Sequence, residues 1–266
     1  MASAPRYTHG HAESVLRSHR WRTAANSAAY LLPRLRPDQH LLDVGAGPGT
    51  ITAELATIVA RVTAIEVSDE VAALTRAGTR DQPNVDVAVG DAHALAFPDA
   101  TFDVVHAHQV LQHVADPVRV LRELVRVTKP GGVVAVRDSD YGGFVWAPES
   151  AGLTRWRALY CAAARANEGE PDAGRHLLFW AQAAGVELAR ITASSSTWCF
   201  ATPADRAWWG GMWADRVTDS ALARQLREEA LADDAELAGL ARAWRDWAAD
   251  PGAWLSVLHG ELLIDC

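Results

Sequence analysis

Short apolar runs alternate with segments of helical spacing from residue 40 to residue 137. Each run has the length of a buried strand and is followed by a turn or by a helix-length segment. Repeated strand and helix units of this length predict an α/β fold, with a parallel sheet covered by helices. The predicted strands are residues 41–44, 62–66, 85–89, 102–108 and 133–136.

Boundary signals divide the segments between these strands. Residues 50–60 have helical spacing, and Ser68 or Asp69 is placed to cap the next helix. Residues 117–127 form a further helix, which opens with a proline at a tolerated first-turn position. The Lys-Pro-Gly-Gly run at residues 129–132 predicts a turn before the last strand.

The pattern changes after residue 137, where longer helical segments dominate. Residues 154–166 and 173–184 are helical in spacing, residues 186–200 are extended, further helices follow, and residues 254–264 predict a closing strand. Of the 11 tryptophans, only Trp21 precedes Trp146. Most of the other ten could pack within a cap and its core. Alternatively, a few of them could line an acceptor pocket.

Composition narrows the classes of protein that fit. A chain of 266 residues with 49% hydrophobic content can bury a substantial core. Cys161, Cys199 and Cys266 lie far apart, which predicts neither a zinc site nor disulfides and favours a reducing, cytoplasmic setting. The sequence predicts neither export nor a membrane span. The net charge of −8 disfavours a nucleic-acid partner.

A glycine-rich turn follows the first predicted strand, with the sequence Asp43-Val44-Gly45-Ala46-Gly47-Pro48-Gly49. Glycine permits unusual backbone angles and lets a ligand come close to the main chain. A dinucleotide fingerprint starting at Gly45 needs Gly or Ala at position 50, where this chain has Thr50. The turn therefore disfavours a nicotinamide cofactor.

This turn resembles the first motif of class I S-adenosylmethionine-dependent methyltransferases, D-x-G-x-G-x-G, and Asp43, Gly45, Gly47 and Gly49 occupy its defining positions. The resemblance implies a Rossmann-like class I methyltransferase fold, with a mostly parallel seven-stranded sheet, helices on both faces and a helical cap. It implies S-adenosylmethionine as the cofactor and S-adenosylhomocysteine as the product. It also implies that these four residues and Ala46 bind the cofactor.

Further cofactor contacts follow from the same resemblance. Glu66 ends the second predicted strand, where the family places an acid that receives both ribose hydroxyls, a task that suits an acceptor-only carboxylate. Asp91 and Ala92 follow the third strand, where the Asp side chain accepts from the adenine amino group and the next backbone N–H donates to the ring. Val67 would cover one adenine face. Taken singly, Glu66 could cap a helix and Asp91 could form a turn.

Residues 102–117 resemble the block shared by small-molecule methyltransferases related to those of ubiquinone and menaquinone biosynthesis, and the resemblance covers residues 40–137. It implies that His108 and Gln109 lie beside the sulfonium and its methionine moiety. His106 shares a strand face with His108, but no third ligand has a matching local spacing. Packing is therefore the favoured interpretation of His106, and no metal is predicted.

Three segments are expected: an N-terminal helical lid at residues 1–35, a cofactor-binding core at 36–140, and a helical cap with the closing strands at 141–266. Many relatives use their N-terminal helix as a lid, and the expected lid contacts are Tyr7, His9, His11 and Arg22. Tyr7 and His9 are candidate catalytic groups, and Arg22 is a candidate cofactor contact. A solvated terminal segment is the alternative for each.

The sulfonium is an activated methyl donor, so the protein mainly has to hold a nucleophile in line with the methyl group and exclude water. An acidic acceptor also benefits from a base. Asp138, Asp140 and Tyr141 leave the fifth strand at the ligand edge and are candidates for orientation or proton transfer. Asp140 could equally cap a helix or pair with an arginine. His113 is a further candidate that could instead pack or contact the acceptor rim.

The sequence thus predicts methyl transfer to a small aromatic acceptor, such as an indole, phenol or quinone precursor, by in-line displacement. A protein or RNA methyltransferase would instead predict a basic groove or a recognition domain. A non-catalytic regulator that binds S-adenosylmethionine or S-adenosylhomocysteine is a third hypothesis, and a nicotinamide oxidoreductase, which Thr50 disfavours, is a fourth. The acceptor, the methylated atom and the oligomeric state are not specified by the sequence.

Overall fold

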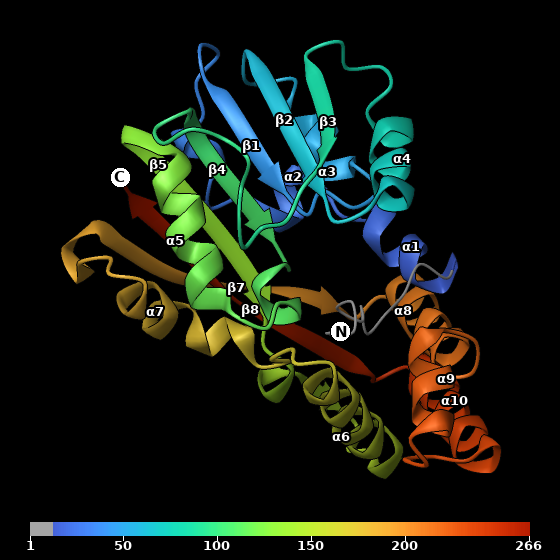
Figure 1. Ribbon diagram of the computed structural model, residues 1–266. Helices are drawn as coiled ribbons and strands as arrows, with labels where there is room; N and C mark the ends of the chain where they lie inside the picture. Colours follow the sequence, from blue (N-terminus) through green and yellow to red (C-terminus); the bar gives the residue numbers. More distant parts are fainter. Residues whose placement is uncertain (1–12) are drawn as a thin grey trace. The chain divides into compact units, whose positions relative to one another are not determined.

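The computed structural model describes residues 13–266, and these divide into two compact units (Figure 1). Residues 19–139, 173–196 and 259–266 form what we call the sheet unit, and residues 13–18, 140–172 and 197–258 form the helical unit. The lid, core and cap borders expected from the sequence stay a prediction. No helix within residues 13–266 is both long and apolar enough to cross a membrane.

A mostly parallel sheet is the centre of the sheet unit, as predicted. Strands β3, β2, β1, β4 and β5 lie side by side in this order and are parallel, and β8 is antiparallel to β5. The short β6 pairs with the start of β8 within the helical unit, so the sheet has eight strands where seven were expected. The strands are β1 His40–Val44, β2 Arg61–Glu66, β3 Val85–Val89, β4 Phe102–His108, β5 Thr128–Ser139, β6 Val145–Ala147, β7 Ile191–Phe200 and β8 Trp254–Asp265.

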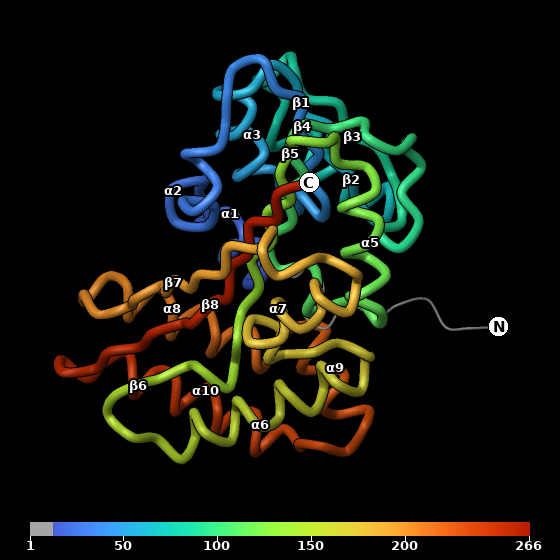
Figure 2. Tube along the Cα trace, turned by 90° about the vertical axis from the view of Figure 1, so that its left-hand side faces the viewer, coloured from blue at the N-terminus to red at the C-terminus, as the bar shows by residue number. Residues whose placement is uncertain are grey.

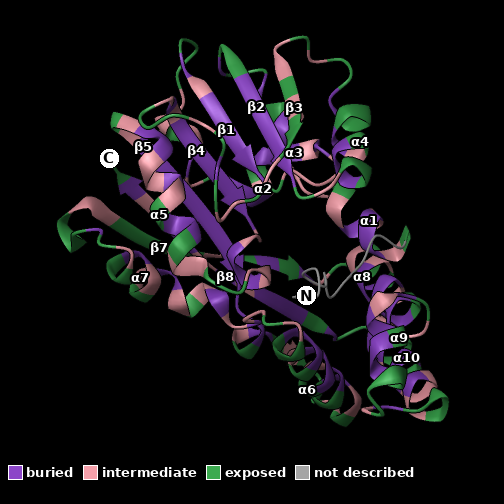
Figure 3. Cartoon of the chain, viewed as in Figure 1, coloured by how far each residue is buried: buried purple, intermediate pink, exposed green. Residues whose placement is uncertain are grey.

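Helices cover both faces of this sheet because neighbouring apolar residues of a strand point to opposite sides. Leu42 belongs to a buried cluster with residues of α5 and α7, whereas Leu41 belongs to another with residues of α2 and α3. Figure 2 shows α2 and α3 on one side of β1, β4 and β5 and α5 on the other, and Figure 3 shows how completely these strands are buried. The helices are α2 Ala24–Ser27, α3 Thr50–Leu55, α4 Asp69–Gly78, α5 Pro117–Val127 and α7 Ala173–Ala183.

Two predicted boundaries were wrong. Helix α3 ends at Leu55 rather than at residue 60, because the Asn84 side-chain amide donates to the carbonyl oxygens of Ala56 and Val59 at 2.8 and 3.2 Å and holds this segment in a turn. The turn predicted at residues 129–132 lies within β5, where it shifts the register against β4 as a bulge does.

Tryptophans form the core of the helical unit. Trp156 packs edge to face on Trp213 and Trp244, with ring centroids 4.5 and 4.8 Å apart, and all three side chains are buried. Trp209 and Trp247 are buried as well. Packing therefore accounts for these five rings. The regular elements of this unit, besides β6 and its part of β8, include α1 Glu13–Arg20, α6 Ala151–Ala166, α8 Pro203–Arg216, α9 Ala221–Glu228 and α10 Asp234–Ala249.

Candidate functional site

The strand order of the sheet unit reverses direction between β1 and β4, and ligands of open α/β sheets bind where the order reverses, at the carboxyl ends of the strands. The glycine-rich turn follows β1 at this edge, and residues 109–113 follow β4. The two segments touch, since a Cβ atom added to Gly45 would lie 2.6 Å from Cγ2 of Val110. The fold thus brings both predicted cofactor segments together.

Gly47 exposes the main chain of the turn. Its φ of +58° lies in the left-handed region that favours glycine, and an added Cβ would meet nothing within 4 Å. The backbone N–H of Gly47 donates to Oε1 of Glu66. Open space where a side chain would otherwise stand is what the close approach of a ligand to the main chain requires. Gly47 therefore occupies the position that the motif predicts for contact with a cofactor.

Asp43 stabilises the turn from beneath. Its carboxylate is buried, and its two oxygens accept from Thr52 Oγ1 at 2.6 Å and bond His106 Nδ1 at 2.8 Å. Both acceptor oxygens are thus engaged inside the protein. These contacts indicate that Asp43 stabilises the conformation of the glycine-rich turn. They also place His106 in the packed interior, which is the interpretation that the sequence favoured.

Glu66 and Val67 offer different surfaces at the end of β2. Glu66 is only 7% exposed, and burial raises the pKa of its carboxyl although the backbone N–H groups of Gly47 and Val67 donate to it. The Val67 side chain is 70% exposed, which is unusual for a large apolar residue. A carboxylate beside an open glycine and an uncovered apolar side chain suit a ribose and the face of a base.

Asp91 lies at the neighbouring position, just after β3, which pairs with β2 through Glu66 and Val89. The Asp91 side chain is 66% exposed and accepts from the backbone N–H of His93 at 2.9 Å. This hydrogen bond is the main reason that its pKa is lowered. Asp91 is thus an ionised acceptor in contact with solvent, and half-buried Ala92 follows it.

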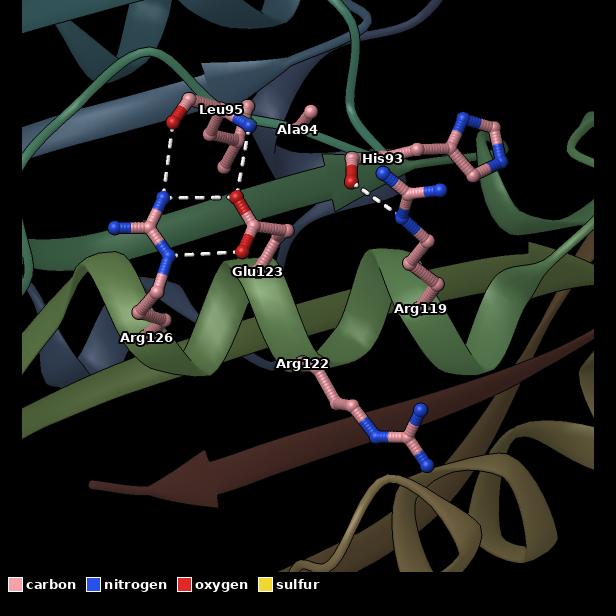
Figure 4. Close-up of a pocket in the computed structure, with 7 residues that line it drawn as sticks. All are labelled: His93, Ala94, Leu95, Arg119, Arg122, Glu123 and Arg126. Atoms are coloured by element: carbon pink, nitrogen blue, oxygen red, sulfur yellow. Dashed lines mark hydrogen bonds and ion pairs between the residues drawn. The ribbon is translucent and has the colours of Figure 1, made fainter.

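A groove of about 400 Å³ lies on the outer side of this segment (Figure 4). Arg126 of α5 pairs with Glu123 at 2.8 Å, and Glu123 accepts from the backbone N–H of Leu95 at 2.8 Å. Arg119 Nε donates to the carbonyl oxygen of His93 at 2.8 Å. These contacts fasten the residues after Asp91 to α5, so the groove supports the cofactor edge from outside.

His108 ends β4, Gln109 follows it, and long-range contacts hold both side chains. Gln109 has a φ of +55°, accepts from Arg22 at 2.6 Å through Oε1 and bonds His259 Nε2 at 2.9 Å through Nε2. His108 is buried and stacks against His259 with ring centroids 6.3 Å apart. Burial, followed by the charges of Arg137 and Arg22, lowers the His108 pKa well below its usual value, so the imidazole is neutral at pH 7.

Gln112 links the end of β5 to the loop after β4, a role that the sequence did not reveal. Its backbone N–H donates to Oδ1 of Asp138 at 3.0 Å, and its side chain accepts from the backbone N–H of Ser139 at 3.3 Å. The Gln112 amide also bonds His113 Nε2 at 2.9 Å. The signal available was the place of Gln112 between His108 and His113 in the block of residues 102–117.

Two members of this network have displaced pKa values. Burial, with a smaller contribution from the charge of Arg22, lowers the pKa of His113 to about 3. Burial also raises the pKa of Asp138 to about 7, against the lowering effect of the backbone N–H groups of Gln112, which donates to Oδ1, and of Leu111. His113 is therefore neutral at pH 7, whereas Asp138 changes its charge near that pH.

The remaining candidates are not part of this cluster. Asp140 caps a short turn of the helical unit, where its Oδ1 accepts from the backbone N–H of Gly143 at 2.9 Å. The Tyr141 ring is buried in a stack between Tyr160 and Phe144, at centroid distances of 4.0 and 4.4 Å. Capping and packing account for these two side chains, and their catalytic roles stay predictions. Tyr7, His9 and His11 lie outside the described residues.

Comparisons with known proteins fit this geometry. A family model for a methyltransferase domain matches residues 42–136. An uncharacterized methyltransferase of Schizosaccharomyces pombe is 33% identical over 269 residues, covering 97% of this chain and 95% of that protein. A demethylmenaquinone methyltransferase of Renibacterium salmoninarum is 35% identical over 131 residues, covering 49% of this chain and 52% of that protein.

One solved structure shows the same fold. It is phosphoethanolamine N-methyltransferase 2 of Haemonchus contortus in complex with phosphomonomethylethanolamine and S-adenosylhomocysteine. The superposition has a TM-score of 0.56 at 19% identity and covers 89% of this chain and 52% of that chain. At this identity the likeness concerns the fold, and the choice of acceptor is a separate question.

Proposed function

The chain belongs to the S-adenosylmethionine-dependent methyltransferases, and from that premise we propose that it methylates a small, aromatic acceptor such as an indole, phenol or quinone-like ring. One observation carries the proposal. The open backbone of Gly47, the carboxylate of Glu66 and the exposed carboxylate of Asp91 lie in order along one edge of the sheet, beside the loop that follows β4.

The residues at this edge fit the cofactor. Glu66 would receive the ribose hydroxyls and exposed Val67 would cover the adenine, while Asp91 and the backbone of Ala92 would meet the edge of the base. Gly45, Ala46, Gly47 and Gly49 would line the path of the methionine part, and Asp43 would keep their turn in shape. When bound, the cofactor supplies an activated methyl group on a positively charged sulfur.

The loop after β4 combines a neutral imidazole with a guanidinium engaged in a hydrogen bond. His108 is neutral, so its ring adds no positive charge beside a sulfonium, while Arg22 donates to the Oε1 atom of Gln109. Because Arg22 comes from the N-terminal segment, this contact supports the proposed lid at residues 1–35. The chain itself orients the acceptor in line with the methyl group and keeps water away.

A small acceptor is supported by the relatives and by charge. One relative acts, by its name, on demethylmenaquinone. The net charge of −8 disfavours a polyanionic partner such as RNA. An aromatic acceptor rests on the demethylmenaquinone relative, because five of the buried tryptophans of the helical unit, Trp156, Trp209, Trp213, Trp244 and Trp247, are engaged in packing.

Calorimetric titration with S-adenosylhomocysteine tests the cofactor site. We expect saturable binding to the wild-type protein, weakened in Glu66→Ala and in Asp91→Ala, and no binding of NAD. Glu70→Ala, which removes an exposed acid from the same edge of the fold, is the matched control and should bind as the wild type does. Equal affinity of all four proteins, or binding of NAD instead, would contradict the proposal. A screen of phenols, indoles and quinols with radiolabelled S-adenosylmethionine then tests the acceptor class.

A further inference from the structure

Asp138 lies near the carboxyl end of β5, two strands from β1, which leads into the glycine-rich turn. Val44 pairs with Ala107 and Ala107 with Val136, and Asp138 follows Val136 by two residues on β5. Two strand spacings, roughly 10 Å, separate β1 from β5. The loop of residues 109–113 bridges this interval, because Val110 packs against Gly45 and the Gln112 N–H bonds the Asp138 carboxyl.

The two oxygens of Asp138 are in different situations. Oδ1 accepts from the Gln112 backbone N–H at 3.0 Å, whereas Oδ2 is buried and meets no hydrogen-bond donor among the described residues. The side chain is 0% exposed. A buried carboxylate oxygen without a donor is costly, and the cost is relieved by a proton or by a bound ligand that donates one. Oδ2 is therefore the one oxygen of this carboxyl that is left for a proton.

The charged and titratable groups around Asp138 come from every element packed near it. Arg137 forms an ion pair with Glu261 at 3.1 Å and Arg22 donates to Gln109, while the charges of both arginines act to lower the pKa of Asp138. His108 and His113 have lowered pKa values and are weak proton acceptors at pH 7. Among the described residues, Tyr30 is coupled electrostatically to Asp138, Glu261 pairs with Arg137, and His259 stacks against His108.

We propose that Asp138 is the proton acceptor of methyl transfer, with Oδ1 fixed by Gln112 and Oδ2 taking the proton from the attacking atom of a neutral acceptor. This inference rests on the proposed function. In the step, a lone pair of the acceptor atom forms the bond to the methyl carbon, and the electron pair of the sulfur–methyl bond returns to sulfur. The acceptor proton moves to Oδ2 and is released to solvent after the product leaves.

The inference limits the class of acceptor. An acceptor that carries both a proton and a lone pair on the attacking atom, such as a hydroxyl or a phenol, needs this carboxylate, whereas an amine that becomes quaternary on methylation does not. The pKa of about 7 gives Asp138 both charge states near neutral pH, which is the balance that a general base requires. Gln112 is then a positioning residue that acts through Asp138.

The test needs no acceptor, because the two forms of the cofactor differ by one positive charge. A carboxyl near the transferred methyl must bind S-adenosylmethionine better when it is ionised, while neutral S-adenosylhomocysteine is indifferent to it. We would measure both dissociation constants by calorimetry from pH 5.5 to 7.5 in the wild type, in Asp138→Asn, and in Asp86→Asn as a control at an exposed carboxylate of β3.

We expect the ratio of the S-adenosylmethionine to the S-adenosylhomocysteine dissociation constant to fall about tenfold over this range in the wild type and in Asp86→Asn, which corresponds to a pKa shift of about one unit. The ratio should stay constant in Asp138→Asn. A constant ratio in the wild type, or an equal fall in Asp138→Asn, would overturn the inference while leaving the cofactor site intact. Loss of both ligands from the wild type would overturn the proposed function as well.

A second measurement covers the case in which Asp138→Asn does not fold. Infrared spectra of wild-type protein with carbon-13 aspartate, saturated with S-adenosylhomocysteine, should contain a buried protonated carboxyl band that disappears between pH 6 and 8. Replacement by S-adenosylmethionine should move this transition to lower pH. A band that titrates only below pH 5, or one that is insensitive to the exchange of ligand, contradicts the assignment of Asp138 as the proton acceptor.

Discussion

The two ends of the candidate site are built in opposite ways. At the end formed by β1, β2 and β3, the exposed residues Val67 and Asp91 lie beside the buried carboxyl of Glu66. At the end formed by β4, β5 and β8, the side chains of His108, Asp138 and His259 are all buried. The first end offers a cofactor exposed groups to bind, whereas at the second end burial displaces the pKa values of neighbouring groups and so controls their protonation.

The largest effect should come from breaking the buried end. Asp138→Asn keeps the shape of the side chain but removes the base, so kcat/KM for a hydroxyl or phenol acceptor should fall about 100- to 10,000-fold. In the wild type saturated with S-adenosylmethionine, kcat/KM for the acceptor should fall with a midpoint below pH 7, because the bound sulfonium lowers the pKa of Asp138 from about 7 and protonation then removes the base. Steady-state kinetics from pH 5.5 to 8.5 measure both effects. If Asp138→Asn has the same kcat/KM and the same pH profile as the wild type, another group accepts the proton of the acceptor.

Removing Glu66 should have the next largest effect, at the accessible end. Charge-assisted hydrogen bonds contribute about 1.5–3 kcal/mol, so Glu66→Ala should weaken binding of S-adenosylhomocysteine about 10- to 100-fold. Glu66→Gln should recover part of the loss, because its carbonyl oxygen still accepts. Calorimetry measures the S-adenosylhomocysteine dissociation constants of both variants. If Glu66→Ala binds S-adenosylhomocysteine as tightly as the wild type does, Glu66 does not bind the ribose.

The accessible end could largely be predicted from the sequence, whereas the buried end could not. Gly47, Glu66 and Asp91 each lie just after or at the end of a strand, so their meeting follows from strand order alone. Asp138 was found as a candidate from its place after the fifth strand, but its importance depends on burial and on Gln112, which is 26 residues away. His259 was not found, because it reaches the site only through the antiparallel pairing of β8 with β5.

The helical unit likewise shows that burial cannot be read from sequence spacing. The many tryptophans in the second half of the chain were compatible with a pocket or with a core, and their spacing does not distinguish these two arrangements. Burial of Trp156, Trp213 and Trp244 favours the core. The roles of Asp140 and Tyr141 are also set by local contacts that no sequence motif predicts. Asp140 forms a capping hydrogen bond, and the Tyr141 ring stacks on Tyr160.

Asp91 offers a smaller test of the accessible end. Its side chain is in contact with solvent, so its hydrogen bond to a base competes with water, and Asp91→Asn should weaken cofactor binding only about 3- to 10-fold. Its effect should therefore be smaller than that of Glu66→Ala in the same titration. A larger loss for Asp91→Asn than for Glu66→Ala would make the exposed acid, rather than the buried one, the main anchor of the cofactor.

The smallest expected effect concerns stability at the buried end. Asp138 has a pKa raised above its value in the unfolded chain, so the folded state holds its proton more tightly and this carboxyl destabilises the fold as the pH rises from about 4 to 7. Asp138→Asn should therefore raise Tm by a few degrees at pH 8 and by less at pH 5. Differential scanning calorimetry at the two pH values measures this, and an equal gain at both would argue against an ionised Asp138.

An experimental structure of the complex with S-adenosylhomocysteine tests the central claim most directly. The account predicts the adenine beside Val67 and Asp91, the ribose hydroxyls on Glu66 in place of the Gly47 N–H, and the sulfur at the loop of residues 109–113 on the side of Asp138. A ligand bound elsewhere, or one that leaves the hydrogen bond between Glu66 and Gly47 untouched and lies away from that loop, would contradict the assignment of this edge as the methyl-transfer site.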